Sequence, residues 1–363
     1  MALYYVGLDY HLRTSTIVML DAHGKRVTQR TIRGHWSKMV QWLRQQNKPM
    51  AICFEASCGY GVLYERLSTF AKRIVVAHPA NLRLIFRSKR KNDRIDAQKL
   101  ATLLLLDQVP AVHVPKLDVR AWREAIEFRR RQVDTRTRIK NQLRALLRGQ
   151  GVVMPREIRG LWTRKGRRWL EGLTWSTPLT QVRCQILLQQ LDDAERMVGR
   201  ITRELDRIAA SHPGVKLLRT IPGVGPRTAE AVVAYIDDPH RFARTNRIGS
   251  YFGLIPCQDS SAGVNRLGHI TKAGPATARK LLVEASWGCV RRCPQIKAIF
   301  DRITAGKKER RRIALIAVTH KLCRIMLAML KSGETFDPLH HGKDEAAEDQ
   351  TVATAATSTT IAA

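Results

Sequence analysis

The sequence predicts an α/β N-terminal domain, a helical coiled-coil middle region and a mainly α-helical C-terminal domain with a helix-hairpin-helix. Strand-type and helical segments alternate at first, an apolar heptad pattern runs over residues 187–208, and short helical segments with glycine-rich turns follow Pro213. The predicted boundaries are 1–115, 116–212 and 213–332, with a disordered tail over 333–363 that has almost no apolar content.

The N-terminal domain is expected to open with a β-meander. Tyr4 to Leu20 is rich in β-type residues, Gly24 and Lys25 make a turn, and Arg26 to Ile32 alternates like a further strand. The later segments are expected as a helix over 36–46, a strand over 50–55, a helix over 61–71, a strand over 73–77 and a helix over 94–105. Strands that alternate with helices after a meander predict a sheet of mixed direction.

The middle region has two helical patterns. Residues 117–150 carry many arginines between apolar positions, and the series from Leu187 to Ile208 steps by four and three residues like a heptad seam. We expect an antiparallel coiled coil, interrupted by a loop near 149–177 that is rich in glycine, arginine and tryptophan.

The charge balance predicts a polyanionic partner. The 363 residues include 63 Lys and Arg against 31 Asp and Glu, a net charge of +32. Such an excess favours nucleic acid, because binding releases condensed counterions. A ribosomal or membrane-surface partner would tolerate the same charge, so charge alone leaves these classes open.

Cysteine usage and hydropathy predict a soluble, cytoplasmic protein with no membrane partner. The seven cysteines are odd in number and scattered, with no Cys-x-x-Cys pair, which argues against a disulfide framework or a structural zinc site. No run approaches about 18 uninterrupted apolar residues.

Four acids stand out in this basic chain. Asp9 follows an apolar run in the first strand, Glu55 ends another buried strand, and Asp93 and Asp96 are spaced i, i+3 at the start of the helix over 94–105. Magnesium prefers oxygen ligands, and cleavage of a phosphodiester by bound metal needs several converging carboxylates. Singly, each acid also fits a turn, a cap or a first-turn helix charge.

The residues around these acids carry a family resemblance. Gly7-Leu8-Asp9, Glu55-Ala56-Ser57 with Gly59-Tyr60, His78-Pro79 and the run from Lys91 to Ala97 resemble the RuvC/RNase H-like nuclease fold. Together they are similar to the DEDD transposases of bacterial insertion sequences. The resemblance implies that Asp9, Glu55, Asp93 and Asp96 bind Mg²⁺.

A second segment, from Gly253 to Gly274, holds two serines in a predicted glycine-rich loop. Such serines are more often turn residues than nucleophiles, although Arg266 and Lys272 could offset charge developing on a phosphate. In the family resembled, a serine in this segment attacks DNA, which implies Ser261, with Ser260 as its rival. The chain departs from the family pattern here, because Ala262 stands where glycine usually follows the serine and Gly263 comes one place late.

Other nucleic-acid contacts are expected in the C-terminal domain. Leu218 to Ala229 matches a helix-hairpin-helix in which Gly223, Gly225 and Arg227 would contact a phosphate, with a plain helical corner as the alternative. The helix over 276–287 with Arg279 and the basic run 307–312 would add nonspecific contacts or form a solvated face. We expect His11, His269 and His320 to be structural.

The resemblance implies a DNA transposase or recombinase that cuts and exchanges strands at insertion-element ends and target. Relatives act as dimers or tetramers, and several use a structured noncoding RNA as guide, which the arginines of 117–170 would suit. The chain has no Gly-x-x-x-x-Gly-Lys-Ser/Thr motif for nucleotide hydrolysis. Such an enzyme is expected to be associated with the nucleoid.

Two other readings are open. A junction nuclease or invertase of the same fold would use the carboxylates alone, and a noncatalytic nucleic-acid-binding scaffold would use neither centre. The sequence leaves the target site, the guide RNA, the reacting serine and the active oligomer undetermined.

Overall fold

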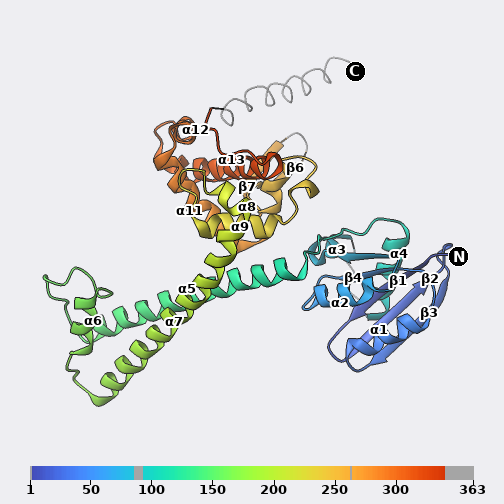
Figure 1. The fold of residues 1–363 in the computed structure, drawn as a ribbon, viewed down its shortest axis with the longest axis horizontal. Helices are drawn as coiled ribbons and strands as arrows, with labels where there is room; N and C mark the ends of the chain where they lie inside the picture. The colour runs from blue at the N-terminus through green and yellow to red at the C-terminus, as the bar shows by residue number, and fades with distance from the viewer. Residues whose placement is uncertain (1, 86–92, 262–263, 340–363) are drawn as a thin grey trace. The chain divides into compact units, whose positions relative to one another are not determined.

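The computed structural model describes residues 2–85, 93–261 and 264–339 (Figure 1), and the chain divides into two compact units, Met1–Leu117 and Asp118–Ala363. The first unit ends two residues beyond the predicted N-terminal domain. The predicted middle region and C-terminal domain both lie in the second unit, and their separation at 212 stays a prediction. Residues 340–363 of the predicted disordered tail lie outside the described part of the chain.

The first unit is built on a five-stranded mixed sheet, as the sequence predicted. Its strands are β1 Tyr4–Tyr10, β2 Thr14–Leu20, β3 Arg26–Arg33, β4 Met50–Glu55 and β5 Arg73–Ala77, in the order β3-β2-β1-β4-β5. The meander β1-β2-β3 is antiparallel, whereas β4 lies parallel to β1 and β5 parallel to β4. The two central parallel strands therefore end at the same edge of the sheet.

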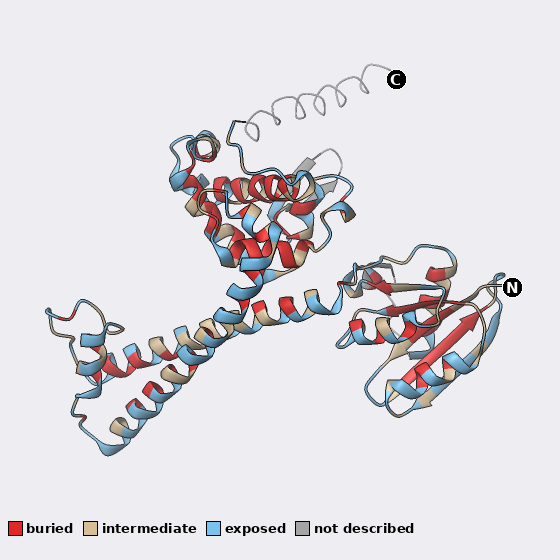
Figure 2. Cartoon of the chain, viewed as in Figure 1, coloured by how far each residue is buried: buried red, intermediate tan, exposed pale blue. Residues whose placement is uncertain are grey.

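Helices cover both faces of this sheet, and Figure 2 shows the buried strands between them. They are α1 Trp36–Gln45, α2 Tyr60–Ser68, α3 Pro79–Ile85 and α4 Asp93–Leu105. Val6 and Leu8 of β1 share a core with buried residues of α1 and α2. Successive strand residues point to opposite faces, so Tyr5, Gly7 and Asp9 belong to the other face, against which α4 packs.

Helix α4 touches the backbone of β1 at Gly7. A Cβ atom added to Gly7 would lie 2.0 Å from the Ala97 carbonyl oxygen and 2.5 Å from the Ala101 nitrogen. Ala97 and Ala101 are one helical turn apart, so two small residues of α4 meet the one position of β1 that has no side chain. This contact fixes where the first turn of α4 lies along β1.

The second unit begins with a helical hairpin made by α5 Leu117–Gly149 and α7 Pro178–Ser211, with α6 Arg164–Glu171 between them (Figure 1). The two long helices run antiparallel, because Lys140 Nζ lies 2.9 Å from Glu195 Oε1 while Arg129 donates to Thr202 at 2.8 Å. Leu143 and Leu191 are buried together between them. Whether the packing is that of a coiled coil stays a prediction.

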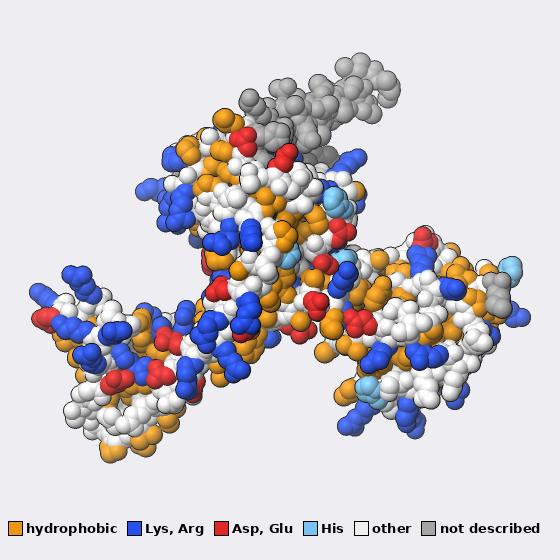
Figure 3. Space-filling view, in the orientation of Figure 1, with side chains coloured by type: hydrophobic (Ala, Val, Ile, Leu, Met, Phe, Trp, Pro, Cys, Tyr) orange, Lys and Arg blue, Asp and Glu red, His pale blue; other side chains and the backbone are white. Residues whose placement is uncertain are grey.

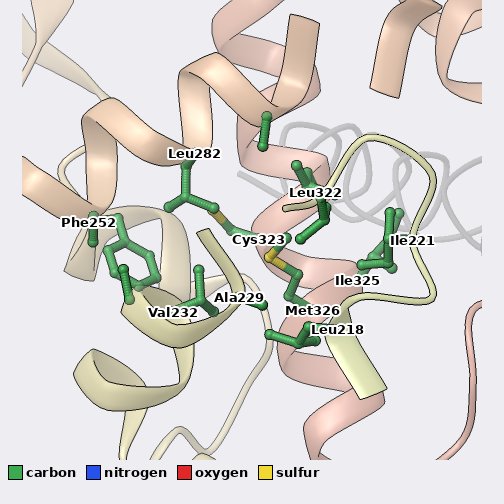
Figure 4. Packing of buried hydrophobic residues seen from close by; sticks show 14 of the residues in the cluster. Leu218, Ile221, Ala229, Val232, Phe252, Leu282, Leu322, Cys323, Ile325 and Met326 are labelled. Atoms are coloured by element: carbon green, nitrogen blue, oxygen red, sulfur yellow. The ribbon is translucent and has the colours of Figure 1, made fainter. Parts of the chain in front are cut away.

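The rest of the second unit is mainly α-helical with one small sheet. Its elements are α8 Pro213–Leu218, α9 Pro226–Ile236, η1 Pro239–Arg241, α10 Arg247–Tyr251, β6 Pro256–Ser261, β7 Val264–Ile270, α11 Ala276–Arg292, α12 Pro294–Thr304, η2 Lys308–Arg310 and α13 Arg311–Ser332. Figure 4 shows Leu218, Ala229, Leu282 and Met326, from four of these helices, meeting in one core. All seven cysteines are free.

Helix α13 is the central helix of this core. Among the described residues, Lys308–Ser332 is the one segment with the length and apolar composition of a membrane span, and 61% of its most apolar window is buried inside the protein. Its residues Leu322 and Met326 are fully buried against the surrounding helices. Its apolar character is explained by this packing.

We expect Gly7→Ala to lower the free energy of unfolding of the first unit by about 1–3 kcal/mol, because the new methyl group must displace the α4 backbone. Gly149→Ala is the control, since a Cβ at Gly149 meets no atom within 4 Å. Chemical denaturation of both variants measures the difference. Equal stability of Gly7→Ala and the parent protein would contradict the close contact.

Candidate functional site

The four predicted acids gather at the edge of the sheet where β1 and β4 end. In the parallel register Leu8 pairs with Phe54, so Asp9 and Glu55 follow on neighbouring strands and on the same face. Asp93 and Asp96 lie in the first turn of α4, which packs on that face. Strands β1 and β4 thus contribute one acid each, and helix α4 contributes two, although the three elements are distant in sequence.

The electrostatics of Asp9 show that these carboxylates act on each other. The Asp9 side chain is 22% exposed, and burial is the largest cause of its raised pKa. His11 lowers the pKa, whereas the negative charges of Asp93, Asp96 and Glu55 raise it further. A group of like charges in a half-buried setting is poorly stable alone and is stabilised by a bound cation.

His11, which was expected to be structural, lies beside Asp9 in this cluster. Its Nε2 lies 3.4 Å from Asp9 Oδ1, and one ligand atom each from Asp9, His11 and Asp93 fall within 4.8 Å of one another. His11 stands two residues after Asp9, just beyond the end of β1. Its closeness to Asp9 in sequence is the signal by which it could have been assigned.

The donor set fits a divalent cation. Carboxylate oxygens dominate it, and Mg²⁺ prefers such hard ligands, while an imidazole nitrogen is a ligand more typical of transition metals. Lys99 Nζ lies 3.6 Å from Asp96 Oδ1 and partly balances the charge of the cluster. Beside it, the Ser57 hydroxyl donates a hydrogen bond of 2.8 Å to the Tyr10 hydroxyl.

The predicted serine loop is a β-hairpin. Ser260 and Ser261 lie at the end of β6, where their backbones pair with Asn265 and Val264 of β7. The segment was expected as a loop because serine, aspartate and glycine are poor strand formers, but pairing with β7 fixes it as a strand. Arg266 also lies in β7, opposite Asp259. Ala262 and Gly263, where the chain departs from the family pattern, lie outside the described residues.

The base of this hairpin is tied to the helical body by two glycines and an arginine. A Cβ at Gly253 would lie 2.3 Å from the Ala273 oxygen, and one at Gly274 would lie 2.1 Å from the Tyr251 oxygen. Arg279 donates to the carbonyl oxygens of Phe252 and Ala273 at 3.0 and 2.7 Å, so its guanidinium braces these two segments. Lys272, in the same loop, is exposed and has a left-handed backbone, with φ of 53°.

The predicted helix-hairpin-helix corresponds to α8, the turn that follows it, and α9. Gly223 has a φ of 99° and packs on α11, since a Cβ there would lie 2.4 Å from the Gly288 carbonyl carbon. A Cβ at Gly225, by contrast, would meet no atom within 4 Å. Gly223 is thus required for helix packing, and the open surface of the turn lies at Gly225. Binding of a phosphate by this turn stays a prediction.

Arg227, the third predicted residue of this turn, forms ion pairs within the protein. It contacts Asp206 of α7, and its Nη1 lies 3.2 Å from Glu230 Oε1. Glu230 is only 1% exposed, and burial raises its pKa to about 7 although Arg227 and Arg129 lower it. This buried acid was not predicted from the sequence, and it lies among apolar residues of α9.

Several arginines of α5 also bind within the protein. Arg123 donates to the Ala234 and Tyr235 carbonyl oxygens at the end of α9, at 2.7 and 3.1 Å. Arg129 donates to Thr202. Towards α6, Trp162 lies under the cationic groups of Lys140 and Arg144, at 5.0 and 5.3 Å. Figure 3 shows the blue Lys and Arg side chains that gather over the α6 end of the hairpin.

The chain matches two models of insertion-sequence transposases. A model of IS110-type DEDD proteins, described as "Transposase", matches residues 6–151, and one described as "Transposase IS116/IS110/IS902 family" matches residues 215–301. The first spans the acidic cluster and the second spans the serine hairpin.

Full-length relatives agree with these matches. A protein of Pseudomonas aeruginosa described as "Probable family 20 transposase" is 26% identical over 93% of this chain and 100% of its own length. The "Transposase for insertion sequence element IS1111A" of Coxiella burnetii is 26% identical over 91% of this chain and 90% of its own. The "Transposase for insertion sequence element IS1328" of Yersinia enterocolitica is 24% identical over 91% and 98%.

The two matched models and the full-length relatives together define the chain as a DNA transposase. The chain belongs to the DEDD-type transposases of bacterial insertion sequences, as the sequence motifs predicted.

We expect Glu230→Gln to remove a pH dependence of stability. The folded-state pKa of about 7 lies above the ordinary value of 4.5, so the folded protein holds an extra proton between these values. Stability from this group is therefore present at low pH and lost as pH rises through about 7, by about 3 kcal/mol in total.

Denaturation of the parent protein and Glu230→Gln at pH 5 and pH 8 measures this loss, and the variant should gain relative stability at pH 8. Glu204→Gln, which alters an exposed acid of α7, should show no such gain. Parallel pH profiles for the parent and Glu230→Gln would contradict the assignment.

Proposed function

We propose that this transposase cuts and exchanges DNA strands at insertion-element ends and target through a magnesium site and a nucleophilic serine. The observation that supports the first half is that Glu55, Asp93 and Asp96 lie close enough to Asp9 to act on its charge, on the mixed sheet of the first unit. The serine half rests on the family resemblance and on the position of Ser261 at the end of a braced hairpin.

The acidic cluster holds the cation in this proposal. Asp9, Glu55, Asp93 and Asp96 supply the oxygen ligands, and His11 either adds a ligand or holds Asp9 in place. Bound Mg²⁺ supplies positive charge to the attacking and leaving oxygens of the phosphodiester. A water molecule or hydroxyl that loses its proton there passes it to a carboxylate or to solvent.

The serine step is a transesterification. The Ser261 hydroxyl, or that of Ser260, gives up its proton to a base, its oxygen forms a bond to phosphorus, and the bond from phosphorus to one deoxyribose oxygen breaks. That oxygen takes up a proton and leaves as a free strand end. Attack by the hydroxyl of another strand reverses the step, frees the serine and joins the new partner. The number of phosphodiester bonds is unchanged, so no nucleotide hydrolysis is required.

A structured guide RNA is part of the proposal, and the α6 end of the helical hairpin is the surface that suits it. Arg164, Lys165 and Arg168 are basic there, and Trp162 is flanked by Lys140 and Arg144. Cationic and aromatic side chains together favour unpaired or irregular RNA. A homodimer or tetramer remains the expected active form.

The acid variants Asp9→Asn and Asp96→Asn are expected to reduce strand cleavage by about 10³-fold, because the charge that holds the cation is lost. Asp118→Asn changes an exposed acid outside the cluster and should leave cleavage unchanged. Gel assays of element-end DNA, with Mg²⁺ binding measured by calorimetry, test this. Unchanged activity and binding would instead favour a noncatalytic scaffold.

The serine variants separate a recombinase from a nuclease. Ser261→Ala should abolish the covalent protein–DNA product, detected by denaturing gel electrophoresis, whereas Ser260→Ala should retain it if Ser261 is the nucleophile. The reverse result exchanges their roles. Strand nicking that persists with both serines replaced, without strand transfer, would favour the junction nuclease or invertase.

The RNA surface is tested by filter binding of the element's own noncoding transcript. Arg164→Ala with Arg168→Ala should weaken RNA binding about tenfold or more and lower its salt dependence. Arg244→Ala with Arg247→Ala removes the same charge from another exposed part of the chain and is the control. Equal losses from the two double variants would assign the effect to overall charge.

A further inference from the structure

The second unit contains a cavity beside the base of the serine hairpin. It has a volume of about 760 Å³ and lies between the ends of β6 and β7 and the helices α12 and α13. Pro256 and Ile270, which are partners in the register of β6 and β7, contribute to its wall. The volume falls within the range of sites that bury small organic ligands, about 300–1,000 Å³.

The lining of this cavity combines one sign of charge with an apolar surface. Lys272, Arg302 and Arg312 line it, and no aspartate or glutamate is among the lining residues of the described chain. Ile299, Ile303 and Ile313 supply apolar surface from the neighbouring helices. Ile313 is 63% exposed, which is unusual for a large apolar side chain.

The cationic and the apolar residues of this lining suit two different parts of one ligand. The cations suit a phosphate, and the isoleucines suit a flat apolar group such as a nucleobase. A free phosphate would leave the isoleucines unused, and an apolar ligand alone would leave the cations without a partner. Two histidines, His269 and His320, also line the cavity and could donate hydrogen bonds to a base or phosphate.

The cavity is also placed along the path of the proposed DNA strand. Ser261 follows Pro256 by five residues of β6, which at about 3.3 Å per residue puts its backbone about 17 Å from the cavity wall. The base of the hairpin is braced by Arg279 and by the close contacts of Gly253 and Gly274, so this spacing is held. A strand whose phosphate meets Ser261 has a nucleotide a few steps away within reach of the cavity.

We propose that this cavity takes up one nucleotide of a DNA strand, unstacked from its neighbours, with the base against the isoleucines and its phosphate on Lys272, Arg302 and Arg312. The inference rests on the proposed function, because it assumes that the second unit handles DNA. It deepens that function by assigning a base-binding site that would hold an opened strand near the proposed serine.

The experiment compares single strands that have bases with strands that lack them. Fluorescence anisotropy of the full chain is measured with oligothymidylate of about twelve nucleotides and with an abasic strand of the same length. Because every nucleotide of this strand is the same, the result does not depend on which one occupies the cavity. We expect the parent protein to prefer oligothymidylate about tenfold, since base contacts add to phosphate contacts.

Two variants separate the base from the phosphate. Ala317→Phe fills the cavity from α13 and should abolish the preference for bases while leaving the salt dependence unchanged. Arg302→Ala with Arg312→Ala should weaken both strands and lower the slope of log affinity against log salt by about 1.4. Arg244→Ala with Arg247→Ala, two exposed arginines of the same unit that do not line the cavity, is the matched control. Circular dichroism melting of each variant checks its folding.

Crosslinking with 4-thiothymidine strands, followed by mass spectrometry, provides a measurement that needs no variant and should map to the segments 299–303 and 312–324. A base preference unchanged in Ala317→Phe, or crosslinks only outside these segments, would overturn the proposal. If the protein binds duplex element ends but shows no preference for single strands that carry bases, the proposed role of the cavity is overturned and the proposed function is not. Failure to bind either DNA would overturn the proposed function with it.

Discussion

The contact between Gly7 and helix α4 is the constraint on which the acidic cluster depends. Only a residue without a side chain lets the Ala97 and Ala101 backbone approach β1 so closely. Because α4 begins at Asp93, this approach carries two acids to the strand end that holds Asp9. The cluster therefore results from helix packing at Ala97, four residues after Asp93. Its four carboxylates carry the same charge and do not attract one another.

Holding like charges together opposes folding. Two carboxylates about 5 Å apart repel by about 3 kcal/mol at an effective dielectric constant of 20. Burial is the main cause of the raised pKa of Asp9, and this repulsion raises that pKa further. The α4 contact and the apolar cores on the two faces of the sheet must offset it. A cation would relieve the same strain, which links the fold of this unit to the chemistry proposed for it.

The sequence predicted the elements better than their partners. The apolar runs that precede Asp9 and Glu55 placed each acid at a buried strand, and the i, i+3 spacing put Asp93 and Asp96 on one helical face. The parallel pairing of β1 with β4, which makes Asp9 and Glu55 neighbours, is seen only in the structure. The sequence did not predict the β6–β7 hairpin, whose strand form comes from pairing across 264–270 and not from local propensity. Nor did it show that Arg123, Arg227 and Arg279 bind partners within the protein. In sequence, an arginine that binds a phosphate cannot be told from one that binds a carbonyl or carboxylate of its own chain. His11 was expected to be structural because no partner for it is visible in the sequence, whereas in the structure it lies beside Asp9 just beyond the end of β1.

The net charge of +32 attracts phosphates to the chain, but the charge of the acidic cluster has the opposite sign. There, four carboxylates repel the phosphate that the proposed reaction must place among them. Salt-screened attraction by distant lysines and arginines acts over about 10 Å and cannot neutralise charges in direct contact. A divalent cation held by these carboxylates would supply the positive charge that offsets this repulsion. Under the proposed function, basic surfaces would gather the nucleic acid, and a cation bound at the acidic cluster would be needed to hold the strand there for cleavage.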